Sequence, residues 1–354
     1  MSRPSKRWHR DERGASPRPL NQILVGDVRD ILRSIPDSSI DCVVTSPPYF
    51  RLRNYQHPDQ IGLEAHVDAW VAELRSVTQE LKRVLAPTGC LWLNLGDTYS
   101  RHLSDGARPK GLVLAPERLA IALVEDGWII RNKVIWAKTN PMPTSVRDRL
   151  SCTYELVYFA TKEAKYHFHL DAIRIPHTSN RGPKRTARQA WSVPDEWRGP
   201  SSGSNTGLDR LKAQGLAGHP LGKNPGDVWN LSTAGFRGNH HATYPEALVR
   251  RPLLATCPRQ VCTTCGRPSR QPPVRAIGEL AVTGEFRPTC SCRAPMRPGI
   301  VLDPFMGSGT TAVVAEQLGL DWIGVEINEE IADMARKRTE AARLARPAAA
   351  RRAA

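Results

Sequence analysis

The chain alternates short apolar runs with amphipathic stretches of helical length over most of its 354 residues. The helical pattern is clearest at 66–85, where apolar residues recur every three or four positions before Pro87 and Gly89 end it. We predict strands for the apolar runs at 23–25, 42–44, 90–95, 154–160, 300–302 and 322–325. Continuous apolar strands are typical of parallel sheets that helices cover on both faces. The alternation therefore predicts an α/β fold.

Composition divides the chain into five parts. The two ends are basic or rich in alanine, arginine and proline, so we expect them to be flexible. Periodicity disappears in the middle of the chain, where glycine, proline, serine and arginine are frequent, and this predicts a loop-rich insertion. The parts are a flexible N-terminus (1–20), a first half (21–170), the insertion (171–240), a second half (241–343) with a cysteine-rich segment (257–293), and a flexible tail (344–354).

The segment VLDPFMGSGTT, residues 301–311, combines an acidic residue at a strand end, a glycine-rich turn and a helix start. Gly307 and Gly309 allow a ligand to approach the backbone, and Glu326 ends the next strand at a spacing typical of an acid that meets ribose hydroxyls. Ser308 or Thr310 is expected to cap the helix. The lysine of a phosphate-binding loop is missing. The segment therefore favours a cofactor cradle without a phosphate-binding role, with an ordinary tight turn as the alternative.

The segment TSPPY, residues 45–49, follows an apolar run directly. It would lie at the carboxyl end of a parallel strand, where open α/β sheets bind ligands. Pro47 and Pro48 fix the backbone, while Ser46 offers a hydroxyl and Tyr49 a flat ring. These groups suit a base amino group, although the segment taken alone could be a turn.

The two segments together resemble the amino-methyltransferases of DNA, whose catalytic motif is S/D/N-P-P-Y/F/W and whose S-adenosylmethionine motif is D-P-F-x-G-S-G-T-T. The catalytic motif comes first here, as in the permuted β class of that family. The resemblance extends over most of the chain, from Gly26 and Asp27 through LWLNLGDTY (91–99) and HHATYPEAL (240–248) to IGVEIN. It implies a Rossmann-like S-adenosylmethionine-dependent methyltransferase fold with a mostly parallel, seven-stranded sheet in permuted order. It also implies that 171–240 is the target-recognition region.

The resemblance further implies the site residues. In the catalytic set, Ser46, Pro47, Pro48 and Tyr49, the Ser46 side chain and the Pro47 carbonyl would accept hydrogen bonds from the amino group, and Tyr49 would stack on a flipped base. The methyl donor S-adenosyl-L-methionine would lie on the second motif, with Glu326 at its ribose and Asp27 near its adenine. Asp27 could instead be a turn residue after a strand. The cofactor-binding set is Asp27, Asp303, Phe305, Gly307, Ser308, Gly309, Thr310 and Glu326.

The predicted activity is that of a DNA (cytosine-N4-specific) methyltransferase, because a serine at position 46 in place of aspartate resembles the N4-cytosine members of the family. N6-adenine remains open, since some adenine enzymes share the serine. Methylation at a ring carbon of cytosine needs a thiolate, usually in a Pro-Cys pair, and the chain has no Pro-Cys dipeptide. The remaining alternatives are an RNA or protein methyltransferase and a non-catalytic DNA-binding relic, whose motifs should be damaged.

A structural zinc site is predicted from four cysteines at metal-ligand spacings. Cys262 and Cys265 form a CxxC, and Cys290 and Cys292 form a CxC, each near glycine or proline turns. Reduced free cysteines are the alternative, and Cys257 is a substitute ligand. The other four cysteines are expected to be buried thiols. His219, His240 and His241 lack paired carboxylates, so we interpret them as solvated or structural.

The charge of the chain fits a nucleic-acid partner. Lysine and arginine outnumber aspartate and glutamate by 50 to 35, which gives a formal net charge of +15. This charge indicates an anionic partner, for which nucleic acid is the leading candidate, although ribosome-associated and membrane-surface proteins are also basic. The resemblance implies that the partner is double-stranded DNA. A restriction-modification context would add a cognate restriction endonuclease as a functional partner. No run of about 18 apolar residues occurs, so we expect a cytoplasmic protein without a membrane partner.

Overall fold

A computed structural model describes residues 19–55, 57–176, 219–234, 243–272, 275–277, 280–282 and 284–345. The described residues fall into two compact units: one lies within Met1–His169, Asp227–Ser269 and Pro288–Ala354, and the other lies within Leu170–Gly226 and Arg270–Arg287. The predicted flexible ends lie outside the described residues, except for 19–20 and 344–345. Most of the predicted target-recognition region, 177–218 and 235–240, also lies outside them.

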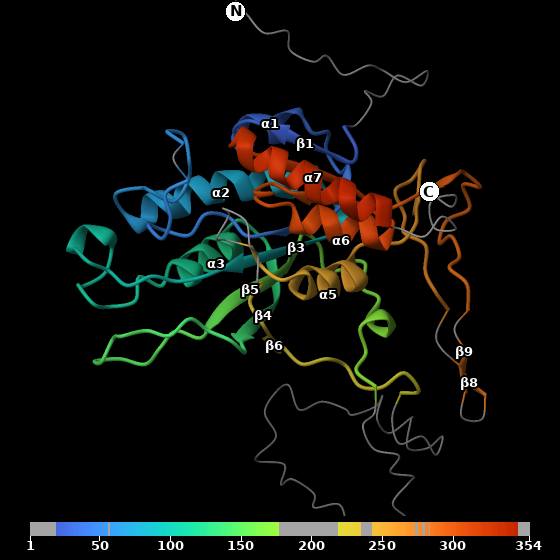
Figure 1. The fold of residues 1–354 in the computed structure, drawn as a ribbon. Coiled ribbons are helices and arrows are strands. Elements are labelled where there is room, and N and C mark those ends of the chain that lie inside the picture. The colour runs from blue at the N-terminus through green and yellow to red at the C-terminus, as the bar shows by residue number, and fades with distance from the viewer. Residues whose placement is uncertain are drawn as a thin grey trace, which may run out of the picture. The chain divides into compact units, whose positions relative to one another are not determined.

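The first unit is built on one eight-stranded sheet (Figure 1). Only β5 runs antiparallel to its neighbours among the paired strands of this sheet, and the other described pairs are parallel. The α/β fold and the mostly parallel sheet are thereby confirmed. In spatial order the strands are β1 (Gln22–Val25), β12 (Asp321–Glu326), β11 (Ile300–Asp303), β2 (Ile40–Thr45), β3 (Leu85–Leu95), β5 (Tyr154–Thr161), β4 (Ile129–Lys138) and β6 (Val228–Leu231).

The eighth strand, β6, corrects the expected count of seven. It falls at the end of the stretch without periodicity, and Asn230 interrupts its apolar residues, so it gives no continuous apolar run. It pairs in parallel with β4, and its Trp229 side chain is buried beside Trp92, with the two ring centroids 5.9 Å apart. Pairing with β4 and the buried Trp229 side chain therefore hold this strand at the edge of the sheet.

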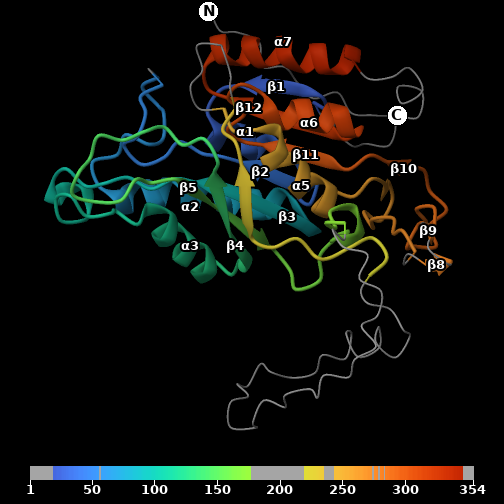
Figure 2. The ribbon, with the colours of Figure 1, turned by 60° about the horizontal axis from the view of Figure 1, so that its bottom comes forward.

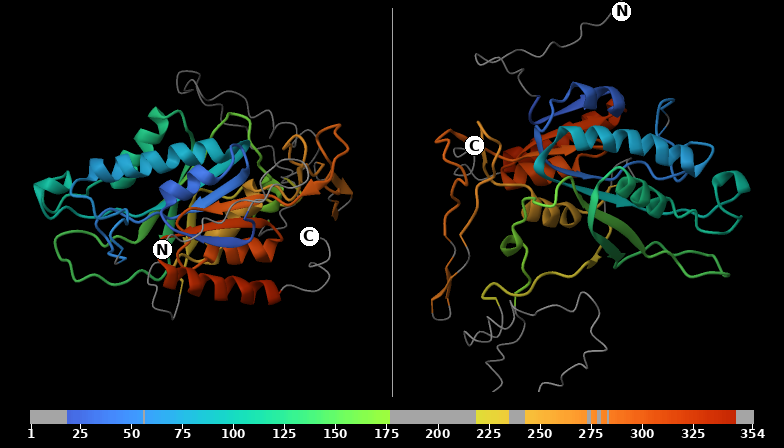
Figure 3. Two further views of the ribbon diagram at one scale, coloured as in Figure 1. Left: turned by 90° about the horizontal axis from the view of Figure 1, so that it is seen from above. Right: turned by 180° about the vertical axis from the view of Figure 1, so that it is seen from behind.

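Helices cover both faces of this sheet, as the view from above in Figure 3 shows for α2 and α7. Alternate residues of β2 contribute to the two hydrophobic layers: Val43 packs in one, and Cys42 and Val44 pack in the other. This is why the strand reads as a continuous apolar run. The first layer holds α1 (Val28–Ser34), α2 (Val67–Val84) and α3 (Ala115–Glu125), and the second holds α5 (Glu246–Thr256), α6 (Thr310–Leu318) and α7 (Glu329–Ala345).

The turn between β11 and α6 depends on glycine rather than on a side-chain cap. The expected cap by Ser308 or Thr310 is wrong, because Gly309 is the N-cap residue and no side chain bonds there. Gly309 has φ +83°, and a Cβ at this position would lie 2.9 Å from the Cβ of Ala335 on α7. Both the backbone conformation and the close approach of the next helix therefore require glycine.

The connection from α5 to β11 contains the cysteine-rich segment. Within the first unit, β7 (Val261–Cys262) pairs antiparallel with β10 (Met296–Arg297). Within the second unit, β8 (Arg275–Ile277) and β9 (Leu280–Val282) form a hairpin. None of the helices in the described part of the chain is long and apolar enough to cross a membrane.

Candidate active site

A cavity of about 700 Å³ opens at the carboxyl ends of the central strands, on the edge of the sheet where α/β folds bind ligands. Residues 26–28 after β1, 46–49 after β2 and 304–308 after β11 line it, together with 326–327 at the end of β12. The sheet order places these four segments next to one another although they are far apart in the sequence (Figure 2). One cavity therefore brings together both motifs of the sequence.

Most of the predicted site residues contribute to this lining. All four predicted catalytic residues do so. The residues of the predicted cofactor set that line the cavity are Asp27, Phe305, Gly307, Ser308, Thr310 and Glu326. Asp303 and Gly309 are not among the lining residues, and Gly309 serves the turn described above.

Hydrogen bonds at three of its residues hold the TSPPY loop in place. Trp70 on α2 donates its indole N–H to the Pro48 carbonyl at 3.0 Å. The Ser46 hydroxyl donates to the Tyr49 hydroxyl at 3.1 Å, and Tyr49 in turn donates to a Glu155 oxygen at 2.6 Å. Burial, together with the nearby Glu155 carboxylate, holds the pKa of Tyr49 well above its usual range. Tyr49 is therefore a neutral phenol. Ser46 donates to Tyr49 and Tyr49 donates to Glu155, so this donor chain ends on the Glu155 carboxylate.

Sequence reasoning missed three polar residues of this site: Asn94, Lys138 and Glu155. All three line the cavity. The Asn94 amide donates to Tyr49 at 2.7 Å and to Glu155 at 2.8 Å, and Lys138 Nζ lies 2.6 Å from the second Glu155 oxygen. The available signal was a polar residue inside an otherwise apolar strand, as in LWLNL for Asn94.

Asp303 connects the two motifs through hydrogen bonds, and it does not line the cavity. Its side chain is fully buried, and one carboxylate oxygen accepts from Thr45 Oγ1 at 2.7 Å and from the Phe305 N–H at 3.1 Å. The other oxygen accepts from Thr311 Oγ1 at 2.7 Å and from the Tyr244 hydroxyl at 3.0 Å. Burial raises the pKa of Asp303, against the effect of these hydrogen bonds. The carboxylate thus joins the end of β2 to the start of α6.

Glu326 presents a carboxylate to the cavity from the end of β12. Its oxygens accept from the Gly307 N–H at 2.8 Å and from the Asn328 N–H at 3.0 Å. Burial raises its pKa. Each carboxylate oxygen can accept two hydrogen bonds, so Glu326 retains capacity for ligand hydroxyl groups.

Asp27 has a structural role as well as a place in the lining. It caps α1 by accepting from the Arg29 N–H at 2.8 Å, and it forms an ion pair with the Arg29 guanidinium. Hydrogen bonding from the Arg29 side chain lowers the pKa of Asp27. Asp27 is therefore an ionised cap at the cavity wall, and its contact with an adenine ring stays a prediction.

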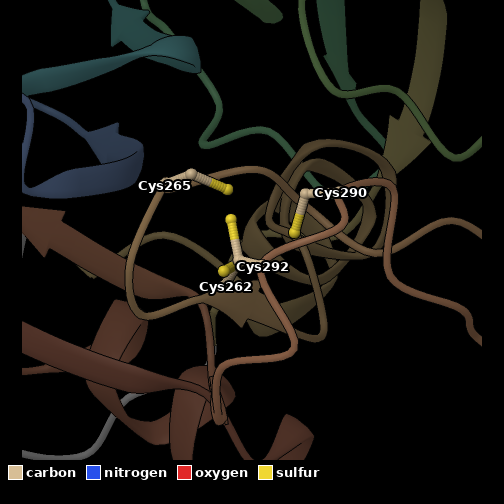
Figure 4. Close-up of side chains that lie close together, drawn as sticks. All are labelled: Cys262, Cys265, Cys290 and Cys292. Carbon is tan, nitrogen blue, oxygen red and sulfur yellow. The ribbon is translucent and has the colours of Figure 1, made fainter.

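The four cysteines of the predicted metal site converge. The sulfur atoms of Cys262, Cys265, Cys290 and Cys292 all lie within 4.8 Å of one another (Figure 4). Within the described residues, this is the one group of histidine, cysteine or acidic side chains arranged to hold a metal ion. Of the remaining cysteines, Cys42, Cys90 and Cys257 are buried as expected, whereas Cys152 is exposed, which corrects that expectation. His240 and His241 lie outside the described residues.

Sequence comparison assigns the chain to a protein family. The family model described as DNA methylase, of the N6/N4 type, matches residues 40–337. The type II methyltransferase M.SmaI of Serratia marcescens is 31% identical, and the match covers 90% of each chain. M.SfiI of Streptomyces fimbriatus, also a type II methyltransferase, is 30% identical over 87% of this chain and 88% of its own.

Solved structures share the fold. The PvuII DNA methyltransferase, described as cytosine-N4-specific, gives a TM-score of 0.55 at 17% identity, over 89% of this chain and 85% of that one. A putative DNA modification methylase of Thermus thermophilus, complexed with S-adenosyl-L-methionine, gives 0.50 at 20% identity, over 92% and 96%. These similarities confirm the fold predicted from the sequence.

Proposed function

The chain belongs to the N6/N4-type DNA methylase family and is a DNA methyltransferase, and on that premise we propose that it methylates the N4 amino group of cytosine in duplex DNA. The methyl donor is S-adenosyl-L-methionine. The observation that carries the proposal is the Ser46 hydroxyl in the cavity lining, at the head of the donor chain through Tyr49 to Glu155.

The cavity fits a nucleoside-type methyl donor. Its volume of about 700 Å³ lies within the range of roughly 300–1,000 Å³ typical of small-molecule sites. Glu326 offers carboxylate oxygens for ribose hydroxyls, and Phe305 offers an apolar surface. The glycine-rich motif lacks the lysine of a phosphate-binding loop, as suits a ligand without phosphates. When bound, S-adenosyl-L-methionine supplies an activated methyl group on a sulfonium.

The reaction requires a group that first accepts hydrogen bonds from the amino N–H groups and then accepts a proton from the amino nitrogen. An exocyclic nitrogen is a poor nucleophile because its lone pair is conjugated with the ring, so positioning and electrostatic stabilisation must supply the rate. Ser46 Oγ and the Pro47 carbonyl accept the two N–H bonds. As the carbon–nitrogen bond forms and the bond between the methyl carbon and the sulfonium sulfur breaks, Ser46 would take the released proton and pass its own to Tyr49, whose proton would move to Glu155. Lys138 balances the Glu155 charge in the resting state.

Cytosine is the proposed base because position 46 carries serine. A neutral hydroxyl is a weaker hydrogen-bond acceptor and a weaker base than a carboxylate. The Glu155 carboxylate at the end of the donor chain supplies the basic group that Ser46 lacks. Tyr49 contributes ring surface to the cavity, which favours stacking on a base that has left the duplex.

Duplex DNA and a restriction-modification context complete the proposal. The net charge of +15 favours binding to phosphates, and Arg53 adds a cation at the cavity wall. The relatives M.SmaI and M.SfiI are type II methyltransferases, which favours a cognate restriction endonuclease as the functional partner. Residues 171–240 remain the proposed target-recognition region.

Product analysis tests the proposal. Unmethylated duplex DNA is incubated with isotope-labelled S-adenosyl-L-methionine, digested to nucleosides and examined by mass spectrometry. Labelled N4-methylcytosine is the expected product, and it should be lost in Ser46→Ala but retained in the control Ser76→Ala, whose hydroxyl is exposed on α2 and bonds only its own helix. Labelled N6-methyladenine would contradict the choice of base and preserve the family chemistry.

A further inference from the structure

We propose that Cys262, Cys265, Cys290 and Cys292 bind one structural Zn²⁺ ion as thiolates, and that this ion fixes the segment that leads from α5 into β11. The proposal does not depend on which base is methylated. None of the four cysteines lines the cavity, so the ion takes no part in methyl transfer.

The sulfur arrangement matches one tetrahedral ion. A Zn–S bond of about 2.3 Å in a tetrahedron places the sulfur atoms about 3.8 Å apart. All four sulfur atoms here lie within 4.8 Å of one another, and Figure 4 shows them coming together from two loops. A disulfide would bring together only one pair, whereas this geometry groups all four. Four sulfur ligands in a tetrahedron select zinc or iron, and zinc binds more tightly than Fe²⁺ at a given site.

The backbone preorganises the half of the site that holds Cys262 and Cys265. The Cys262 N–H donates to the Arg267 carbonyl at 3.0 Å, and the Gly266 N–H donates to the Cys262 carbonyl at 3.0 Å. This turn places Gly266 at φ +68°, a left-handed conformation that glycine adopts without strain. The second half is joined to it by the pairing of β7 with β10, in which Met296 lies opposite Cys262.

Charge in the segment also suits thiolate ligands. Between 257 and 297 the sequence has seven arginines, two glutamates and no aspartate, lysine or histidine. Two of these arginines, Arg267 and Arg293, lie within two residues of a cysteine of the group in the sequence, and positive charge close to a thiolate stabilises it. Cys257 is not an alternative ligand in this structure, because it packs in the second hydrophobic layer and is not part of the four-sulfur group.

The ion would act on the fold through β10. Arg297 in β10 forms a salt bridge with the buried Asp41 of β2 at 2.6 Å. The same Asp41 oxygen accepts from the Ile300 N–H at 2.8 Å, at the first residue of β11. β11 ends at Asp303, from which the cofactor loop begins. The metal site therefore secures the segment that enters the central sheet directly before the active site.

Metal analysis of the full-length protein, purified without chelator, tests the proposal. We expect about one zinc per chain by elemental mass spectrometry. Zinc should be lost in Cys265→Ser and in Cys292→Ser, and retained in the matched controls Cys152→Ser and Cys257→Ser. Removing the ion with a chelator should lower the melting temperature of the wild-type protein by about 5 °C or more.

Cobalt substitution keeps the test independent of folding in the variants. Wild-type protein reconstituted with Co²⁺ should show the absorption bands of a tetrahedral cobalt thiolate, and competing Zn²⁺ should abolish them. Iron in place of zinc, disulfides among these cysteines, or metal retained in both Cys265→Ser and Cys292→Ser would overturn the proposal.

Discussion

The Asp303→Asn variant measures how strongly one carboxylate holds the two motifs together. The substitution preserves the side-chain shape and removes one of two acceptor oxygens. In the wild-type protein these oxygens accept four hydrogen bonds, from Thr45, Phe305, Tyr244 and Thr311, in a fully buried position. An amide nitrogen would face two of these donors with a donor of its own.

The expected cost follows from those contacts. A hydrogen bond to a charged group contributes roughly 1.5–3 kcal/mol, so two of them amount to roughly 3–6 kcal/mol. Two effects reduce this figure: a buried charge is removed, and the Thr311 hydroxyl can turn to the Val44 carbonyl 3.4 Å away. We therefore expect Asp303→Asn to lower the free energy of unfolding by about 2–4 kcal/mol. Asp303→Ala should lower it further, because it also leaves the Phe305 N–H without an acceptor.

Urea unfolding followed by circular dichroism is the assay. The matched control is Asp333→Asn, an exposed carboxylate on α7 that pairs with Arg336, for which we expect a change below about 1 kcal/mol. If Asp303→Asn unfolds at the same urea concentration as Asp333→Asn, the buried carboxylate does not hold β2 to α6, and the reasoning is refuted.

Three further predictions follow from other contacts. Glu155→Gln should reduce the rate of methyl transfer at least about tenfold without changing the affinity for S-adenosyl-L-methionine, while Glu125→Gln leaves both unchanged; equal rates in the two variants would contradict the proton path. Hydrogen bonds from the Arg101 and His102 N–H groups lower the pKa of Asp105 to about 2, below its usual 3.8. The stability that the Asp105 carboxylate contributes to the folded protein is therefore present above pH 3.8 and is lost as the pH falls toward 2. The difference in melting temperature between the wild-type protein and Asp105→Asn should shrink over that interval, and a constant difference would argue against it. Burial raises the pKa of Cys42 to about 12, so iodoacetamide should modify Cys152 but not Cys42 in the folded protein; mass spectrometry of the peptides would expose equal modification.

Most strands of the central sheet, and the helix α2, were predictable from the pattern of their apolar residues. A strand such as β2 is apolar throughout since both of its faces are covered, and α2 repeats its apolar residues with the helical period. The edge strand β6 (VWNL) was not predictable, because Asn230 interrupts its apolar residues, whereas the equally short edge strand β1 (QILV) contains a continuous apolar run.

The candidate site was predictable to the extent that its residues lie in contiguous motifs. Ser46 and Glu326 lie in or near such segments, and the structure places both in one cavity. Glu155 and Lys138 come from neighbouring strands, and only their pairing in the sheet brings them to Tyr49. Asp303 shows the opposite case, since its motif position was clear but its carboxylate faces buried donors rather than the cavity.

The most direct test of the proposed catalytic site is a single-turnover measurement of methyl transfer by Ser46→Ala at saturating S-adenosyl-L-methionine and DNA. We expect the rate to fall about 100-fold or more, because the variant removes the proposed acceptor of the amino group's hydrogen bond and the first member of the proposed proton path. A Ser46→Ala enzyme that transfers methyl groups to DNA at the wild-type rate would contradict the assignment of this cavity as the place of reaction.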